Sequence, residues 1–389
     1  MNIVNQIINN VKKNENFFSP FLLNKKKRAL RSSTLRFLNS TTYRELEDNS
    51  RTPRSINYNI HEKTRTLLPL GEIMHRFELY EKYGYKYQRL HFPHLVNVYL
   101  LGLFFFHNSS LIHKRLIQKI IKEPNRIFVP ELKKRFDFSS EHPEGEFYYR
   151  WRLASLCHDF GYPIELLSND AKKLNLVLEE IDAEISTSIL TVDDLYRYNQ
   201  VDLMSKINDN ISNVDLLKYD KYRRENPIFK ESIFDHGIYG ALLFLNSMYS
   251  HFKLYPILIE RDDGSRILTS NELLGGSLLT VSSSIALHNI DSHPEALLIS
   301  VNNHDNQIYN LENDPLSFLL KLCDEIQEWY KFERQEIIVN KLYEEKLEET
   351  EMYIDFDGDR IIINNLKNAD EVRDKIEEMF NPSKIIQIE

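Results

Sequence analysis

An adjacent histidine and aspartate, His158 and Asp159, are the side chains of this sequence with the clearest capacity for chemistry. They end an apolar segment from Trp151 to Phe160 whose spacing predicts a helix, and Gly161 and Pro163 follow as helix-ending residues. Two polar side chains at the end of a buried helical face need a partner. Imidazole nitrogen and carboxylate oxygen together suit divalent ions such as Zn, Fe or Mn, so a metal ion is one candidate for that partner.

Four further residues of ligand type stand at the edges of apolar helical segments. They are His94, His236, His288 and Asp324. The His-Asp pair alone is a weak signal, because chance surface pairs and hydrogen-bonded core pairs share the same two residues. The same residue types beside four more predicted helices make the signal much stronger.

The order of these residues resembles that of the HD-domain metal-dependent phosphohydrolases: His, then His-Asp, then often two further His, then Asp. The resemblance covers roughly residues 85 to 335 and implies an HD-type helical bundle. It implies that His94, His158, Asp159 and Asp324 hold one ion, while His236 and His288 hold a second ion that shares Asp159. Catalysis would fall on His158, Asp159, His236 and His288, with two divalent ions drawn from Mn, Fe, Zn, Co and Mg.

The activity implied is hydrolysis of a phosphoester or phosphoanhydride, expected to be that of a nucleotide, by a metal-activated hydroxide. A two-metal site acidifies a water and clamps the attacking and leaving oxygens of a phosphoryl transfer. Relatives that act on cyclic dinucleotides commonly have Lys, and those that act on dNTPs commonly have His, where this chain has Tyr162. Neither branch is therefore indicated.

Two alternatives stay open. One is a non-hydrolytic nucleotide-sensing or scaffold protein that keeps the metal site. The other is a helical protein whose histidines are satisfied within its core. Turnover of a nucleotide panel with Mn separates the first from an enzyme, and the distances between the ligand side chains test the second.

Cationic, donor and aromatic groups near the ligands in sequence are candidates for substrate binding, although packing and solvated charge explain them as well. These candidates are His91, Arg150, Arg152, Tyr162 and Lys321. Carboxylates commonly orient metal-binding imidazoles, and Asp235, Glu325 and Asp291 are candidates for that role.

Composition favours a mainly α protein. Among 389 residues, 42% are apolar and 28% charged, and the low counts of 11 Gly and 13 Pro favour helices over a turn-rich β architecture. The net charge of −9 gives no electrostatic signature of a duplex-binding protein, so nucleic acid is possible but not indicated. A nucleotide or another phosphorylated small molecule is the expected partner, and a homo-oligomer stays open.

The cellular setting follows from cysteines and hydropathy. Cys157 and Cys323 are the only cysteines, which is no disulfide framework and points to a reducing cytoplasm. The polar start does not match a signal peptide. The most apolar run, Leu95 to Phe106, is shorter than the roughly 20 residues of a membrane helix and reads as a buried core helix, so no membrane association is expected.

Three segments are expected along the chain. Residues 1–60 are polar and basic and predict a partly ordered extension. Residues 61–335 predict the HD-type helical domain, with an insertion at about 165–230 that could form a lid or a cap. Residues 336–389 predict a small α+β element, because alternating residues on both sides of Asp357-Gly358-Asp359 indicate a hairpin and a helix follows through Met379.

Overall fold

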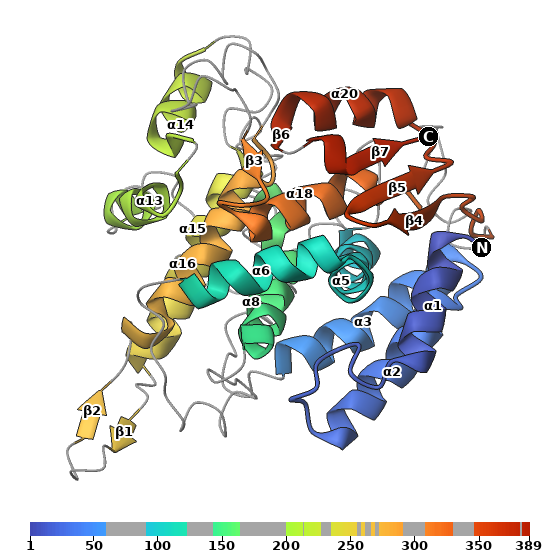
Figure 1. The fold of residues 1–389 in the computed structure, drawn as a ribbon. Helices are drawn as coiled ribbons and strands as arrows, with labels where there is room; N and C mark the ends of the chain where they lie inside the picture. Colours follow the sequence, from blue (N-terminus) through green and yellow to red (C-terminus); the bar gives the residue numbers. More distant parts are fainter. Residues whose placement is uncertain are drawn as a thin grey trace. The chain divides into compact units, whose positions relative to one another are not determined.

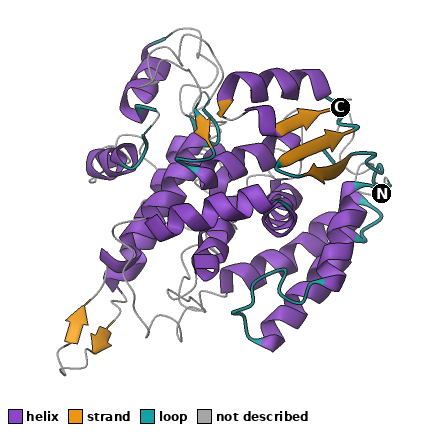
Figure 2. Cartoon of the chain, in the orientation of Figure 1, coloured by secondary structure: helices purple, strands orange, loops and turns teal. Residues whose placement is uncertain are grey.

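Helices dominate the structure, a computed structural model of the chain, and its few strands are short (Figure 2). The mainly α fold class predicted from the sequence is confirmed, including small sheets near the C-terminus. The structure describes residues 1–59, 91–122, 143–163, 200–212, 214–226, 235–254, 258–260, 266–268, 272–290, 308–329, 346–381 and 383–389.

The chain forms two compact units. Unit 1 consists of Met1–Arg65, Glu81–Leu156 and Tyr309–Glu389, and unit 2 of Thr66–Tyr80 and Cys157–Ile308. Unit 1 therefore contains residues from all three segments expected from the sequence.

Three helices form from the N-terminal segment of unit 1, where the composition led us to expect a partly ordered extension. They are α1 (Ile3–Lys13), α2 (Asn24–Leu38) and α3 (Tyr43–Asn59) (Figure 1). Ile3, Ile7 and Val11 form a buried stripe along α1 at helical spacing. The Asn2 side chain caps this helix by accepting a hydrogen bond from the Asn5 N–H at 3.0 Å. Asparagines stand between the apolar positions of α1, so the composition of this segment does not show the helical spacing of its apolar residues.

The core of unit 1 is built around α5 (His91–Asn108), which is buried at every position from His91 to Phe106. The expectation of a buried core helix over residues 95–106 is thus confirmed. Helices α6 (Ser110–Lys122) and α18 (Pro315–Ile326) pack against α5, and α8 (Pro143–Cys157) contacts it through Trp151. A Cβ at Gly102 would overlap the Trp151 indole, whose N–H donates to the Tyr99 carbonyl oxygen at 2.9 Å.

Among the described helices, none is by itself both long and apolar enough to cross a membrane. Helices α5 and α6 meet that test only as a pair, and the chain bends by 97° between them.

The C-terminal part of unit 1 is a small sheet with a helix. Strands β4 (Tyr353–Asp357) and β5 (Arg360–Asn364) pair antiparallel, and Gly358 in the turn has a φ of +61°. Helix α20 (Ala369–Met379) follows, so the predicted hairpin and helix are confirmed. Strand β7 (Ile386–Ile388), after the 3₁₀ turn η3 (Ser383–Ile385), adds a parallel neighbour to β5, and β3 (Tyr309–Asn310) pairs in parallel with β6 (Phe380–Asn381).

Main-chain and side-chain hydrogen bonds join the two ends of unit 1. The Ile3 N–H donates to the Met352 carbonyl oxygen at 2.7 Å. The Gln6 side chain donates to the Ile354 carbonyl oxygen at 2.8 Å and accepts from the Ile354 N–H at 3.0 Å. Gln6 thereby satisfies the main-chain groups of Ile354 in the edge strand β4.

The longer part of unit 2 starts at Cys157, the last residue of α8, and continues with the 3₁₀ turn η1 (His158–Gly161). Its other elements are α13 (Gln200–Asp209), α14 (Leu216–Glu225), α15 (His236–Leu254), the antiparallel pair β1 (Leu258–Glu260) and β2 (Arg266–Leu268), and α16 (Glu272–Leu287). Helix α15 packs against α16 and η1, and α13 packs against both long helices.

Part of the predicted insertion belongs to the helical core of unit 2. Leu203, Ile207 and Tyr219 are buried there. The Asn210 side chain donates to the Ser283 hydroxyl at 2.9 Å, which joins the end of α13 to α16. The rest of the insertion, residues 165–199, 213 and 227–230, lies outside the described residues, and a lid or cap there stays a prediction.

Candidate metal centre

His158 and Asp159 occupy η1, and neither side chain has any exposed surface. Glycine explains how this turn reaches the neighbouring helix. A Cβ at Gly161 would overlap the His236 carbonyl oxygen and would lie 2.5 Å from the Gly240 nitrogen. Because neither glycine has a side chain, η1 and α15 approach backbone to backbone, and Asp159 comes within reach of His236.

Two helix ends supply the next two imidazoles. His236 is the first residue of α15, and Asp235 caps this helix by accepting from the Ile238 N–H at 3.1 Å. His288 lies one residue beyond α16, and its N–H donates to the Ser284 carbonyl oxygen at 3.1 Å. The packing of α15 on α16 brings the two rings to a centroid distance of 5.0 Å.

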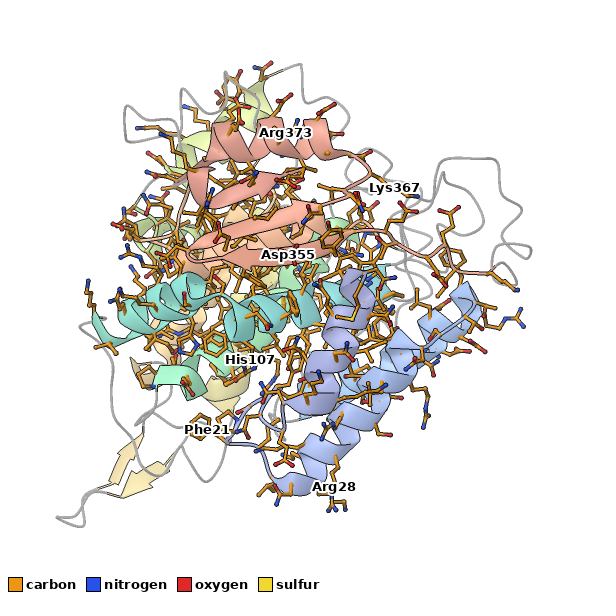
Figure 3. The ribbon with its side chains drawn as sticks, turned by 45° about the vertical axis from the view of Figure 1, so that its right-hand side comes forward. Phe21, Arg28, His107, Asp355, Lys367 and Arg373 are labelled. Atoms are coloured by element: carbon orange, nitrogen blue, oxygen red, sulfur yellow. The ribbon has the colours of Figure 1, made fainter. Side chains whose placement is uncertain are left out.

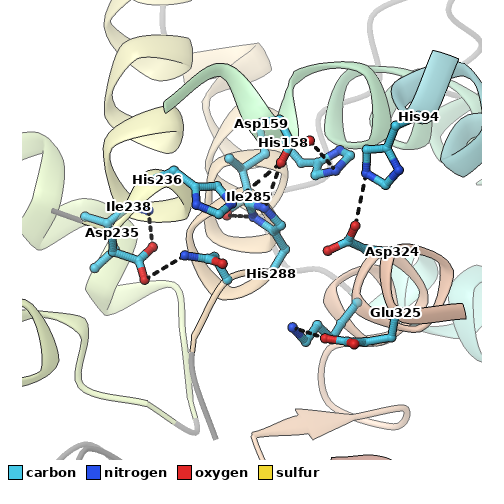
Figure 4. Close-up of polar contacts among 12 residues, drawn as sticks. His94, His158, Asp159, Asp235, His236, Ile238, Ile285, His288, Asp324 and Glu325 are labelled. Atoms are coloured by element: carbon cyan, nitrogen blue, oxygen red, sulfur yellow. Dashed lines mark hydrogen bonds and ion pairs between the residues drawn. The ribbon is translucent and has the colours of Figure 1, made fainter. Parts of the chain in front are cut away.

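The Asp159 carboxylate lies among three imidazoles (Figure 4). Its Oδ1 is 3.6 Å from His236 Nε2 and 3.5 Å from His288 Nε2, while its Oδ2 is 3.4 Å from His158 Nε2. Asp159, His236 and His288 offer ligand atoms that all lie within 4.8 Å of one another. The side chain of His236 is 11% exposed, against 1% or less for the other three, so solvent reaches this cluster at His236.

A main-chain carbonyl determines which nitrogen of the neutral His288 ring carries the proton. Its Nδ1 lies 2.6 Å from the Ile285 carbonyl oxygen, which only accepts, so Nδ1 donates. In the neutral ring Nε2 then carries the lone pair, and this is the nitrogen that lies near Asp159. A fixed tautomer with a lone pair directed at a carboxylate is the arrangement of a metal-binding histidine.

These separations fit a bound cation. They exceed the usual N–H···O length of about 2.7–3.2 Å. Ligands bound at about 2.1 Å stand about 3.0 Å apart at right angles and about 3.4 Å apart in a tetrahedron. The Asp159 contacts of 3.4–3.6 Å match the tetrahedral spacing, and a buried carboxylate needs positive charge beside it. Unit 2 thus contains a buried His/Asp cluster that could hold a metal ion.

Unit 1 holds the remaining predicted ligands. His94 Nε2 lies 3.0 Å from Asp324 Oδ1, and His94 Nδ1 lies 2.5 Å from Gln327 Oε1. The Gln327 amide is oriented by its own donation to the Trp329 carbonyl oxygen at 2.6 Å, so its oxygen accepts from His94. With that tautomer, Nε2 and the Asp324 carboxylate are both acceptors, and a proton or a cation between them satisfies both.

The residues predicted to bind substrate differ in the groups that their side chains contact. Arg150 is ion-paired with Glu146 at 2.6 Å, and Lys321 with Glu325 at 2.6 Å, so each cation has a carboxylate beside it. The Tyr162 ring meets the His236 ring edge-on, with 5.9 Å between centroids.

The other two candidates, His91 and Arg152, are buried in unit 1. Arg152 hydrogen-bonds the Tyr99 side chain and opposes the rise in the Tyr99 pKa that burial causes. Substrate binding by any of the five stays a prediction.

Two of the imidazoles are oriented by groups that were not predicted: Gln327 for His94 and the Ile285 carbonyl for His288. Glu325 binds Lys321 and Lys375, and Asp235 binds the N-terminus of α15 and Arg223. Orientation of an imidazole by either carboxylate stays a prediction, and Asp291 lies outside the described residues. Gln327 follows Asp324 by one helical turn, a spacing that the sequence does reveal. A main-chain carbonyl leaves no such signal.

Comparison of the chain with known protein families, curated proteins and solved structures finds no match.

Proposed function

We propose that the protein is a metal-dependent phosphohydrolase that cleaves a phosphoester or phosphoanhydride, with a nucleotide as the expected substrate. The observation that carries the proposal is the buried Asp159 carboxylate, which lies 3.4–3.6 Å from three histidine nitrogens. A bound divalent ion at such a site neutralises phosphoryl charge and acidifies a water.

The two Asp159 oxygens support sharing of this carboxylate by two ions. Oδ1 lies near His236 and His288, whereas Oδ2 lies near His158. The order of the sequence motif assigns His94 and Asp324 to the ion on the His158 side. Within unit 1, His94 has the lone pair and Asp324 the oxygen that this assignment requires.

The protein residues have separate roles in this proposal. The Ile285 carbonyl keeps the proton on Nδ1 of His288, and the Gln327 amide does the same for His94, so each Nε2 stays available as a ligand. Burial of Asp159 lowers the local dielectric and strengthens its attraction to a cation. His236, with 11% of its side chain exposed, lies where a substrate could enter.

Product analysis tests the activity. Protein loaded with Mn²⁺ is incubated with NTPs, dNTPs, cyclic nucleotides and dinucleotides, and products are separated by chromatography. We expect a monophosphate, pyrophosphate-type or ring-opened product that disappears when EDTA is added. Binding of a nucleotide without any product would support the alternative of a sensing or scaffold protein instead.

Asp159→Asn tests the site itself. The substitution keeps the shape and removes the charge, so we expect loss of bound metal, measured by ICP mass spectrometry, together with loss of turnover. Thermal unfolding in EDTA should show equal or higher stability, because a buried charge is removed. The control, Asp314→Asn, makes the same change at the N-cap of α18 and should retain metal. Full metal content in Asp159→Asn would contradict the proposed site.

A further inference from the structure

A second buried polar cluster in unit 2 surrounds Asp235, a residue with no exposed surface. Its Oδ2 accepts from Arg223 Nη1 at 2.7 Å, from Asn289 Nδ2 at 3.2 Å and from the Tyr219 hydroxyl at 3.4 Å. Its Oδ1 accepts from the Ile238 N–H at 3.1 Å. One carboxylate thus binds four donors.

The positions of these donors along the chain connect the cluster to the proposed metal ligands. Asp235 immediately precedes His236, and Asn289 immediately follows His288. Arg223 and Tyr219 lie one turn apart on α14, and Arg223 also donates to the Tyr219 hydroxyl at 3.2 Å. The hydrogen bonds of Asp235 therefore connect three segments: the start of α15, the turn after α16 and one side of α14.

Stability alone does not explain a buried ion pair of this kind. The Arg223 side chain is 4% exposed and that of Asp235 is 0% exposed, so both charges lose nearly all their hydration. Replacement of such pairs by apolar residues is often neutral or stabilising. A carboxylate that accepts from four donors, by contrast, fixes the positions of the segments that carry them. The segments joined here are those that carry His236 and His288.

We propose that Arg223 and Asp235 act as a positioning pair that sets the affinity of the ion held by Asp159, His236 and His288. This inference rests on the proposed metal site. Neither residue of the pair is assigned as a ligand. The pair acts through the spacing of two imidazoles whose nitrogens must both come within bonding distance of one ion, so a shift of a few tenths of an ångström at either helix end weakens binding.

Metal titration of the folded protein tests the inference. Mn²⁺ affinity is measured by calorimetry for the wild type, Arg223→Lys and Arg223→Met, well below the unfolding temperature of each. We expect binding to weaken about 10- to 100-fold in Arg223→Met, as is typical for groups that orient metal ligands. Arg223→Lys keeps the charge but lacks the planar fork and should recover part of the affinity.

Two further variants separate positioning from folding. Asn289→Ala leaves the Arg223–Asp235 pair intact and removes only its link to the His288 turn, so it should fold and still bind metal more weakly. Lys218→Gln is the matched control on the same helix, because Lys218 is 62% exposed and should leave affinity unchanged. If Arg223→Met fails to fold, the Mn²⁺ affinity of Asn289→Ala alone tests the positioning role. Weaker binding would then support it, and wild-type affinity would overturn it.

The outcomes distinguish this inference from the proposed function. Absence of metal binding by the wild-type protein would overturn the proposed site and the inference together. Wild-type affinity in both Arg223→Met and Asn289→Ala, beside a metal-binding parent, would overturn only the positioning role. A loss in these two variants that spares Lys218→Gln supports it.

Discussion

At the residue scale, oxygen acceptors fix the tautomer of two imidazoles. The Ile285 carbonyl and the Gln327 amide oxygen each accept a hydrogen bond from the Nδ1–H of a histidine whose Nε2 lies near a carboxylate. In the neutral ring, Nε2 then carries the lone pair that binding of a metal ion requires. Residue type and order in the sequence were enough to select His94 and His288, but the acceptors depend on the folded backbone.

A third histidine, His107, has surroundings of a different kind (Figure 3). Its Nε2–H donates to the Phe17 carbonyl oxygen at 3.0 Å, and its Nδ1 accepts from the Asn14 amide at 3.2 Å. The ring also stacks on Phe17. These contacts require the neutral ring, and burial lowers the pKa of His107 although the bond to Phe17 opposes this. His107 therefore connects the segment after α1 to the end of α5.

The lowered pKa of His107 predicts acid sensitivity. Its unfolded pKa is about 6.5 and its folded pKa lies below that, so the unfolded chain takes up the proton first. The free energy of unfolding should fall as the pH decreases through about 6.5, and the loss should end below the folded pKa. Urea unfolding from pH 8 to pH 5 measures this. His107→Gln should show a smaller pH dependence, and an unchanged one would refute the assignment.

At the scale of the secondary-structure elements, a close backbone contact determines the geometry of the site. Turn η1 and helix α15 meet through Gly161 and Gly240, and this contact brings Asp159 to His236. In the sequence Gly161 served only as a helix-ending signal. Gly161 also lets η1 approach α15 closely, and this role depends on which helix packs against the turn. The residues next to Gly161 in the sequence do not show that.

Gly161→Ala should separate these two elements. The new methyl group would overlap the His236 carbonyl oxygen, so we expect a loss of roughly 1–3 kcal/mol in stability and weaker metal binding. Gly276→Ala in α16 is the control, because a Cβ there meets no atom within 4 Å, and it should stabilise by about 0.4–1 kcal/mol. Chemical denaturation and metal titration of both variants provide the comparison. Equal behaviour of the two would argue against the close contact.

Local patterns predicted some elements and missed others. Alternation around Asp357-Gly358-Asp359 predicted the β4–β5 hairpin, because turn and strands lie within one short segment. The parallel pairs β5–β7 and β3–β6 were not predicted, because each needs a partner from elsewhere in the chain. The N-terminal helices were missed because α2 has six Lys and Arg residues among its 15 and conceals its buried side at Leu30, Phe37 and Leu38.

At the scale of the whole molecule, the two cysteines of the chain are divided between the two units. Each unit contains one cysteine, Cys157 in unit 2 and Cys323 in unit 1, and neither forms a disulfide. Both thiols are fully buried, and burial raises the pKa of each well above its usual value. A thiol in this state reacts only when the structure around it opens.

Thiol labelling should therefore report the opening of each unit. We expect no reaction of the native protein with Ellman's reagent and two reactive thiols per chain in denaturant. Cys323→Ser leaves a reporter in unit 2 and Cys157→Ser one in unit 1. Mn²⁺ should slow labelling of Cys157, which precedes His158, because a ligand bound to the native state lowers the open population. Rapid labelling of native protein would contradict the burial of these thiols.

The hydrogen bonds between Gln6 and Ile354 span 348 residues of sequence. During synthesis, α1 must wait for β4 to leave the ribosome before its Gln6 side chain finds these partners. Both parts of unit 2, Thr66–Tyr80 and Cys157–Ile308, lie within that interval. Long-range contacts of this kind slow folding and leave apolar helix faces exposed meanwhile. Production of this protein should accordingly benefit from chaperones that shield the nascent N-terminal helices.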